Sequence, residues 1–202
     1  MAELKLYRSV LPKNNGKEEF IEYRDTMRPP RNVPYLVDNL WEWLRPEEYP
    51  CRRFSAYASP SPELARKSGQ KEGVVFEIEF LGELRIAQVR GYTDSKYHPE
   101  TKKILNEVIG LLNKATGGGW PNFKLERKFN AGKLWVPCLT KKEINGLFEN
   151  VSELGIIETE LRSIIGYWKD VELLDMEKLY LPDENGEIFF EAKGGYWLKP
   201  IA

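Results

Sequence analysis

Histidine and cysteine are scarce in this chain of 202 residues, which holds one histidine and two cysteines. The lone histidine, His98, excludes a metal site built on two histidines and leaves one candidate for a Ser-His-Asp arrangement. Cys51 and Cys138 define neither a disulfide framework nor a metal site, and such a low cysteine content fits a reducing compartment. We therefore expect neither a metal centre nor a disulfide.

Long apolar runs and phosphate-binding loops are also missing. Residues 1–7 lack the apolar core of a signal peptide, and no apolar run approaches the length that spans a membrane. No glycine-rich loop leads into Lys-Ser or Lys-Thr, and no Gly-x-Gly-x-x-Gly follows a strand pattern. The glycines at 117–119 precede Trp120 and Pro121, which is typical of a turn. These absences predict a cytoplasmic protein with no membrane segment and no standard phosphate loop.

A strong net charge is absent. The formal net charge at pH 7 is -1, which argues against a global basic field directed at nucleic acid or a membrane. The charge is uneven, because residues 101–150 carry nine Lys and Arg against four Asp and Glu, whereas residues 151–202 carry five against eleven. Two interpretations stay open: differently charged solvent faces, or a basic surface that binds an acidic partner.

The composition is that of an ordinary folded protein, with 42% hydrophobic and 30% charged residues. The length suits a single domain over residues 1–202, with or without a substantial insertion. Strand patterns follow one another with short connections more often than they alternate with helices. The order of elements therefore predicts an α+β fold with mostly antiparallel sheets, hairpins and a few helices.

Periodicity and turn residues locate the expected elements. Helical spacing predicts helices at 34–44, 62–67 and 99–112 and a further helix from Thr140, where Glu143 completes a capping box; residues 13–25 suit a short helix. Alternation predicts strands at 4–10, 53–58, 74–80, 84–89, 123–129, 133–137, 155–165 and 171–181. Short connections predict hairpins at 74–89, 123–137 and 187–198.

The segment 54–65 is the most informative part of the chain. A β-prone stretch ends at Ser59, a proline-initiated helix follows at once, and Ala65 stands six residues beyond the serine. This arrangement places a serine hydroxyl at the outward end of a strand. Farther along, Glu158 and Glu160 stand two residues apart, and on a strand they would face the same side.

Three motifs in this order resemble those of arginine-type mono-ADP-ribosyltransferases. That family has an Arg on its first strand, a Ser-x-Ser strand end before a helix, and a late Glu-x-Glu pair. Leu6-Tyr7-Arg8 resembles the first motif, Tyr57-Ala58-Ser59 the second, and Glu158-Thr159-Glu160 the third. The resemblance implies a split-sheet core and an NAD⁺ substrate, whose nicotinamide–ribose bond is broken. A segment at about 91–148 would be an insertion into that core.

The resemblance also implies a role for each motif residue. Arg8 would contact the phosphates and ribose of NAD⁺, and Ser59 would orient the catalytic carboxylate. Glu160 would stabilise the developing ribose cation, and Glu158 would position or deprotonate the acceptor. Tyr57 departs from the family pattern, which has serine there, and an aromatic ring at that place can stack on nicotinamide.

A basic cluster of Arg45, Arg52 and Arg53 lies just before the second motif. Two interpretations stay open: Arg53 and its neighbours steer an anionic cofactor such as NAD⁺, or they form a surface patch.

Three functions are compatible with the sequence. The first is an ADP-ribosyltransferase that modifies a protein or nucleic-acid acceptor, as a toxin, effector or phage-borne modifier of a host would. The second is a non-enzymatic binding or inhibitor protein that docks on a macromolecular complex through some of its six tryptophans. The third is a nucleic-acid binder that uses the basic, aromatic stretch 120–129. The sequence leaves the acceptor and the oligomeric state open.

Overall fold

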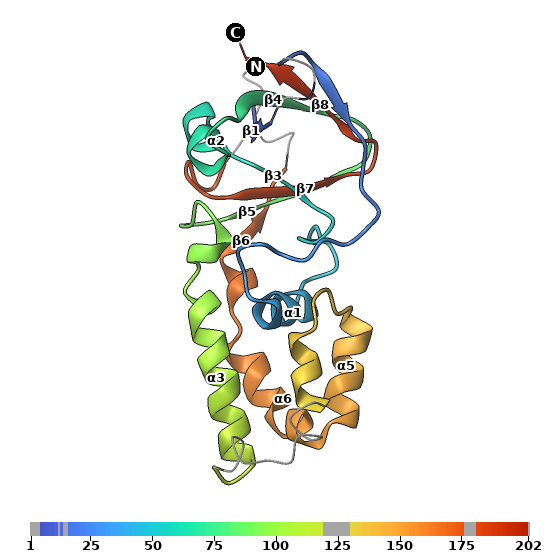
Figure 1. Ribbon diagram of the computed structural model, residues 1–202, viewed down its shortest axis with the longest axis vertical. Helices are drawn as coiled ribbons and strands as arrows, with labels where there is room; N and C mark the ends of the chain where they lie inside the picture. Colours follow the sequence, from blue (N-terminus) through green and yellow to red (C-terminus); the bar gives the residue numbers. More distant parts are fainter. Residues whose placement is uncertain (1–4, 12, 14–15, 119–129, 176–180, 202) are drawn as a thin grey trace. The chain divides into compact units, whose positions relative to one another are not determined.

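The computed structural model describes residues 5–11, 13, 16–118, 130–175 and 181–201. The chain divides into two compact units (Figure 1). Residues 1–27, 46–97 and 169–202 form the first, which we call the strand unit, and residues 28–45 and 98–168 form the second, the helical unit. The helical unit takes in residues 98–148 of the segment that the sequence marks as an insertion.

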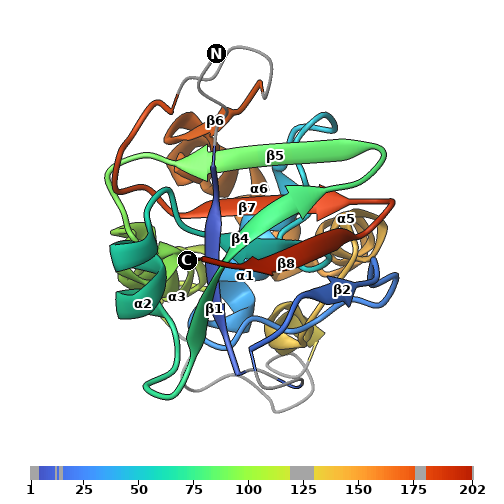
Figure 2. The ribbon, with the colours of Figure 1, turned by 90° about the horizontal axis from the view of Figure 1, so that it is seen from above.

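The strand unit consists of two four-stranded antiparallel sheets (Figure 2). The first sheet has the order β1 (Tyr7–Val10), β4 (Val74–Phe80), β8 (Tyr196–Pro200) and β2 (Glu19–Ile21). The second has the order β3 (Ala56–Ala58), β7 (Ile188–Ala192), β5 (Leu84–Val89) and β6 (Val171–Leu173). Together with the helical unit, these sheets confirm the predicted α+β class.

The core of the strand unit is formed by apolar side chains from both sheets. Along β7, Ile188 and Phe190 are buried in one cluster with Phe76 of β4 and Leu198 of β8. Because side chains alternate along a strand, Glu187 and Phe189 lie on the opposite side of the second sheet from this cluster. Tyr57, the cross-strand partner of Phe189, lies on that opposite side too.

In the described part of the strand unit, a backbone bridge links the first sheet to the residue that follows β3 of the second. Tyr7 and Ser59 exchange both backbone hydrogen bonds, at 2.9 and 2.8 Å, between the end of β3 and the start of β1. Helix α2 (Pro62–Ser68) begins just beyond this bridge, with Ser61 as its N-cap residue and Pro62 in its first turn. The predicted strand end and proline-initiated helix are therefore present.

The predicted hairpins at 74–89 and 187–198 are wrong, although their strands are present. β4 and β5 belong to different sheets, as do β7 and β8, so each short connection is a corner between sheets. The two corners contact each other, since Leu81 donates its N–H to the Gly195 carbonyl at 3.1 Å. A Cβ on Gly194 would lie 2.5 Å from the Leu81 carbonyl oxygen, which explains the glycine there.

Among the described residues, the helical unit includes α1 (Tyr35–Trp43), α3 (Glu100–Ala115), α5 (Lys141–Asn150) and α6 (Ser152–Ile164), which surround an apolar core. Trp41 stacks on Tyr167 with ring centroids 3.9 Å apart, and Trp43 stacks on Phe148 at 4.4 Å. The predicted capping box opens α5, because Thr140 and Glu143 each satisfy a backbone N–H of the other.

The strand predicted at 155–165 is wrong, because these residues belong largely to helix α6. The buried residues Leu154, Ile157 and Leu161 recur at helical spacing, and this periodicity overrides the β-branched pairs that suggested a strand. The pair Glu158 and Glu160 therefore lies on a helix.

Other predictions differ in detail. The suggested short helix at 13–25 contains β2 instead, and residues 133–135 form the 3₁₀ helix η3 (Lys133–Trp135) rather than a strand. Further 3₁₀ turns are η1 (Ser95–Tyr97) and η4 (Tyr167–Lys169). The predicted strand at 123–129, the stretch 120–129 and residues 176–180 lie outside the described residues. Within the described part of the chain, no helix has the length and apolar character needed to cross a membrane.

Candidate functional site

Glu187 enters β7 at a tightly packed position. Its N–H donates to the Tyr92 carbonyl, and its own carbonyl accepts from the Val89 N–H, each at 2.8 Å. A Cβ on the preceding Gly186 would lie only 2.3 Å from the Val89 carbonyl oxygen. Glycine is therefore required for the chain to approach β5 so closely, and this approach sets where the Glu187 side chain begins.

The buried amide of Gln88 anchors the loop before Glu187. Its Nε2 donates to the carbonyls of Asp183 and Gly186, at 2.6 and 3.1 Å, and its Oε1 accepts from the Asp183 N–H at 3.0 Å. The Asp183 carboxylate in turn accepts from the Gly91 N–H at 2.5 Å. Both ends of the loop are thereby tied to the strand that pairs with β7.

The Glu187 carboxylate is held by Ser95 and Arg52. Its Oε2 accepts from the Ser95 N–H at 3.2 Å and from the Ser95 hydroxyl. The Nη1 atom of Arg52 lies 3.4 Å from the same oxygen and 2.8 Å from the Ser95 Oγ. The Glu187 side chain is 13% exposed and that of Arg52 is 7% exposed, so this ion pair is largely shielded from water.

Two aromatic rings support the guanidinium of Arg52. Its Cζ atom lies 5.5 Å from the centroid of the Tyr57 ring and 5.3 Å from that of Phe189. These rings are cross-strand neighbours of β3 and β7, and the Tyr57 hydroxyl donates to the Arg52 carbonyl at 3.2 Å. We call the group formed by Arg52, Tyr57, Ser95, Glu187 and Phe189 the Glu187 cluster.

The charge state of Glu187 is set by opposing influences. Burial raises the pKa of this carboxyl group, whereas the Arg52 charge and the Ser95 hydrogen bonds lower it. The nearby Asp94 charge raises the pKa further, and the net result lies above the ordinary value for glutamate. Groups with raised pKa values that lie beside a specific charge partner are frequent at functional sites.

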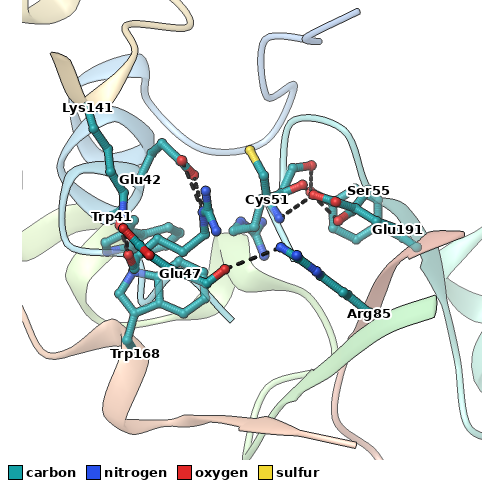
Figure 3. A network of polar contacts seen from close by, with 12 residues as sticks. Trp41, Glu42, Glu47, Cys51, Ser55, Arg85, Lys141, Trp168 and Glu191 are labelled. Carbon is teal, nitrogen blue, oxygen red and sulfur yellow. Dashed lines mark hydrogen bonds and ion pairs between the residues drawn. The ribbon is translucent and has the colours of Figure 1, made fainter. Parts of the chain in front are cut away.

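A second acidic residue of β7, Glu191, fixes the turn that carries Arg52. Its Oε1 accepts from the Cys51 N–H at 2.5 Å (Figure 3). The Ser55 hydroxyl closes the same turn by donating to the Cys51 carbonyl at 2.8 Å. Arg53 follows in this turn and is only 2% exposed, so neither Arg52 nor Arg53 belongs to an exposed patch.

Arg8 and Ser59 belong to the strand unit too. The Arg8 guanidinium donates to the Tyr196 hydroxyl at 2.9 Å, and the Ser59 hydroxyl lies 3.4 Å from that of Ser68. Ser59 follows Ala58, the β3 residue paired with Ile188, whereas Glu187 precedes Ile188 on β7. Ser59 and Glu187 therefore both adjoin the last pair of this ladder, and the Ser59 backbone pairs with Tyr7 rather than with Glu187.

The geometry predicted for Glu158 and Glu160 is wrong. On helix α6 two residues i and i+2 point to different sides, whereas on a strand they would share one. Glu158 accepts hydrogen bonds from Arg162 at 3.0 and 2.9 Å, one helical turn away, and Glu160 is exposed. These carboxylates form an ordinary helix-surface arrangement in the helical unit.

Sequence reasoning missed Glu187 and Ser95. The available signal was a carboxylate directly before the apolar run Ile188-Phe189-Phe190, since such a run is typical of a buried strand. Among the described residues, no group of three or more His, Cys, Asp or Glu side chains is arranged to hold a metal ion. Comparison of the chain with protein-family models, with curated proteins and with solved structures finds no match.

Proposed function

We propose that this protein is an NAD⁺-dependent mono-ADP-ribosyltransferase that modifies a macromolecular target, with Glu187 as its catalytic carboxylate. The observation that carries the proposal is the shielded, charge-paired carboxylate at the start of β7, next to the end of β3 where Ser59 stands. Glu187 takes the role that the sequence suggested for Glu160.

The order of strands supports the proposal. β1 carries Arg8, β3 ends just before Ser59, and β7 begins just after Glu187. These strands are successive neighbours through the Tyr7–Ser59 bridge and the β3–β7 ladder. Arginine, serine and glutamate thus come from neighbouring strands, or the residues next to them, in one unit. Arg8 bonds Tyr196 of the apolar cluster, whereas Glu187 lies on the other side of the second sheet.

The aromatic part of the Glu187 cluster also supports the proposal. Tyr57 and Phe189 present ring faces to the guanidinium of Arg52, which is a planar cation. Because Arg52 occupies these faces, the rings serve the proposal by holding the charged partner of the catalytic carboxylate, and Tyr57, which departs from the family pattern, has this use.

The proposed reaction transfers ADP-ribose from nicotinamide to an acceptor. The bond between ribose C1′ and the nicotinamide nitrogen breaks, and its electron pair leaves with nicotinamide. The Glu187 carboxylate stabilises the positive charge that develops on the ribose. A nucleophilic atom of a protein or nucleic-acid acceptor then bonds to C1′ and releases its proton. Stabilising that charge only in the transition state is what accelerates the step.

The test is incubation of the purified chain with isotopically labelled NAD⁺, alone and in cell lysate. Free nicotinamide and label on macromolecules are measured for the native chain, Glu187→Gln and the matched control Glu160→Gln. We expect Glu187→Gln to lose at least about 100-fold in nicotinamide release, as expected when the main stabilising charge is removed, while Glu160→Gln retains native turnover.

Each outcome has one meaning. Release that is lost only in Glu187→Gln supports the assignment, and the labelled band identifies the acceptor. Native release in Glu187→Gln would remove Glu187 from the catalytic role. Without release by the native chain in any lysate, the transferase proposal fails.

A further inference from the structure

Two neighbours of Glu187 have no role in the reaction as proposed so far. Ser95 lies on the 3₁₀ turn η1, and Arg52 lies on the turn after Cys51. We infer that Arg52 and Ser95 are positioning residues that fix the orientation of the Glu187 carboxylate and favour its charged form. The catalytic consequence of this inference rests on the proposed function, but the arrangement itself can be tested without NAD⁺.

The contacts converge on one carboxylate oxygen. The Ser95 N–H at 3.2 Å, the Ser95 hydroxyl and the Arg52 Nη1 at 3.4 Å all reach Oε2. Arg52 also donates to the Ser95 hydroxyl at 2.8 Å, so Arg52, Ser95 and Glu187 each contact the other two. The position of each partner therefore depends on that of the other. These contacts fix the position of Oε2 and thereby restrict the rotation of the carboxylate.

Arg52 is itself held before any ligand arrives. Its guanidinium packs over the Tyr57 and Phe189 rings, and its backbone is fixed by the Tyr57 hydroxyl and by Glu191 through the adjacent Cys51. The ordering of this long side chain therefore occurs on folding, not on substrate binding. Such preorganisation is what allows a charged neighbour to act on a catalytic group without further reorganisation.

Arg52 counteracts two influences that favour the neutral form of Glu187, namely the nearby Asp94 charge and burial. Asp94 disfavours a second negative charge at Glu187, and Lys96 neutralises Asp94 in part through an ion pair of 3.0 Å. Burial also favours the neutral carboxyl group. Without Arg52, the nearby Asp94 and the shielded environment would both favour protonation of Glu187. A protonated Glu187 could not stabilise a developing cation.

The experiment is a carboxyl titration by NMR on the full chain labelled with ¹³C-glutamate. The Glu187 signal is assigned by its loss in Glu187→Gln. We compare Arg52→Gln, Ser95→Ala and the control Arg90→Gln, an exposed arginine of the same unit that pairs with Glu172 at 3.8 Å. The expected result is a Glu187 titration midpoint higher by about 1–3 pH units in Arg52→Gln, because an opposite charge at this distance lowers a carboxyl pKa by that amount.

Ser95→Ala should move the Glu187 midpoint in the same direction by less, since the Ser95 backbone N–H remains. Arg90→Gln should leave it unchanged. An unchanged midpoint in a folded Arg52→Gln chain would overturn the inference. If Arg52→Gln does not fold, Ser95→Ala decides, and an unmoved midpoint there overturns the inference instead.

A kinetic readout separates this inference from the proposed function. If the native chain releases nicotinamide, the acid limb of its pH–rate profile should shift to higher pH in Arg52→Gln and Ser95→Ala. It should stay at the same pH in Arg90→Gln. A merely structural role would lower the rate without moving that limb. Absence of nicotinamide release from the native chain would defeat the transferase proposal and leave the titration result standing.

Discussion

Glu191 accepts a 2.5 Å hydrogen bond from the backbone N–H of Cys51, directly before the arginine that reaches Glu187. Glu191 of β7 and Glu187, which directly precedes β7, thus have different roles. Glu191 fixes the turn, and Glu187 pairs with the Arg52 side chain that the turn carries. The Glu191 residue is only 7% exposed, so its hydrogen bond is protected from competition by water.

Replacing Glu191 by alanine should therefore destabilise the strand unit. The Cys51 N–H would be left buried without its acceptor, which costs about 1–3 kcal/mol of unfolding free energy. Glu191→Gln keeps an oxygen that can accept from Cys51 and should cost clearly less. Urea unfolding of both variants checks this, and equal losses would show that the charge of Glu191, rather than the hydrogen bond, matters.

The close approach at Gly186 gives a second prediction. In Gly186→Ala the added Cβ would meet the Val89 carbonyl oxygen, a backbone atom that cannot move aside easily. We expect a loss of about 1–3 kcal/mol in unfolding free energy and faster hydrogen exchange at the Glu187 and Val89 amides.

Gly146→Ala in helix α5 is the matched control. A Cβ at that position meets no atom within 4 Å, and alanine is the better helix former, so this variant should gain up to about 1 kcal/mol. If both substitutions had the same effect, the contact at Gly186 would not be what constrains β7.

Local features of this fold were readable from the sequence, whereas strand partners were not. The α5 capping box of Thr140 and Glu143 is a contact between residues three positions apart, and it appears as predicted. The bounds of β4 and β5 also follow from their alternating side chains. The connection at 81–83 suits a hairpin and a sheet corner equally, and only the packing of distant strands decides between them.

The candidate site shows the same division. Arg8, Tyr57 and Ser59 stand out because each belongs to a short local motif. Glu187 owes its character to Ser95 and Arg52, which lie 92 and 135 residues away along the chain. The burial of Glu187 and its partners depend on tertiary structure, so the sequence around Glu187 gives only a weak indication of them.

Asn39 gives a third prediction, in the helical unit. Its buried side-chain amide donates to the carbonyls of Leu134 and Val136, at 2.8 and 2.7 Å, and accepts from the Leu139 N–H at 3.1 Å. Asn39→Asp keeps the shape and the acceptor but replaces the donors by a carboxylate oxygen facing two carbonyls. At neutral pH we expect a loss of at least about 2 kcal/mol in unfolding free energy.

The pH dependence distinguishes this cause from a general packing defect. On acidification the introduced carboxyl group gains a proton that it can donate to one carbonyl, so part of the lost stability should return. Asn39→Leu has no such group and should show the same loss at both pH values. Urea unfolding at pH 7 and pH 5, followed by tryptophan fluorescence, measures the difference, and parallel behaviour of the two variants would contradict the explanation.

The raised pKa of Glu187 gives the last prediction, on stability and pH. Folding raises this pKa above its ordinary value of 4.5, so between those two values the native state binds more protons at this site than the unfolded state. The contribution of Glu187 to the free energy of unfolding is therefore largest below pH 4.5 and falls as the pH rises through the raised value.

Glu187→Gln removes this titration while retaining a side chain of similar shape. The difference in unfolding free energy, native minus variant, should therefore decrease from about pH 4 to pH 7, whereas the same difference for Glu160→Gln should stay flat. Guanidinium chloride is unsuitable because its salt screens the Arg52 charge, so urea is the denaturant to use. An increase with pH would mean that Arg52 outweighs burial and that the folded-state pKa of Glu187 lies below its ordinary value.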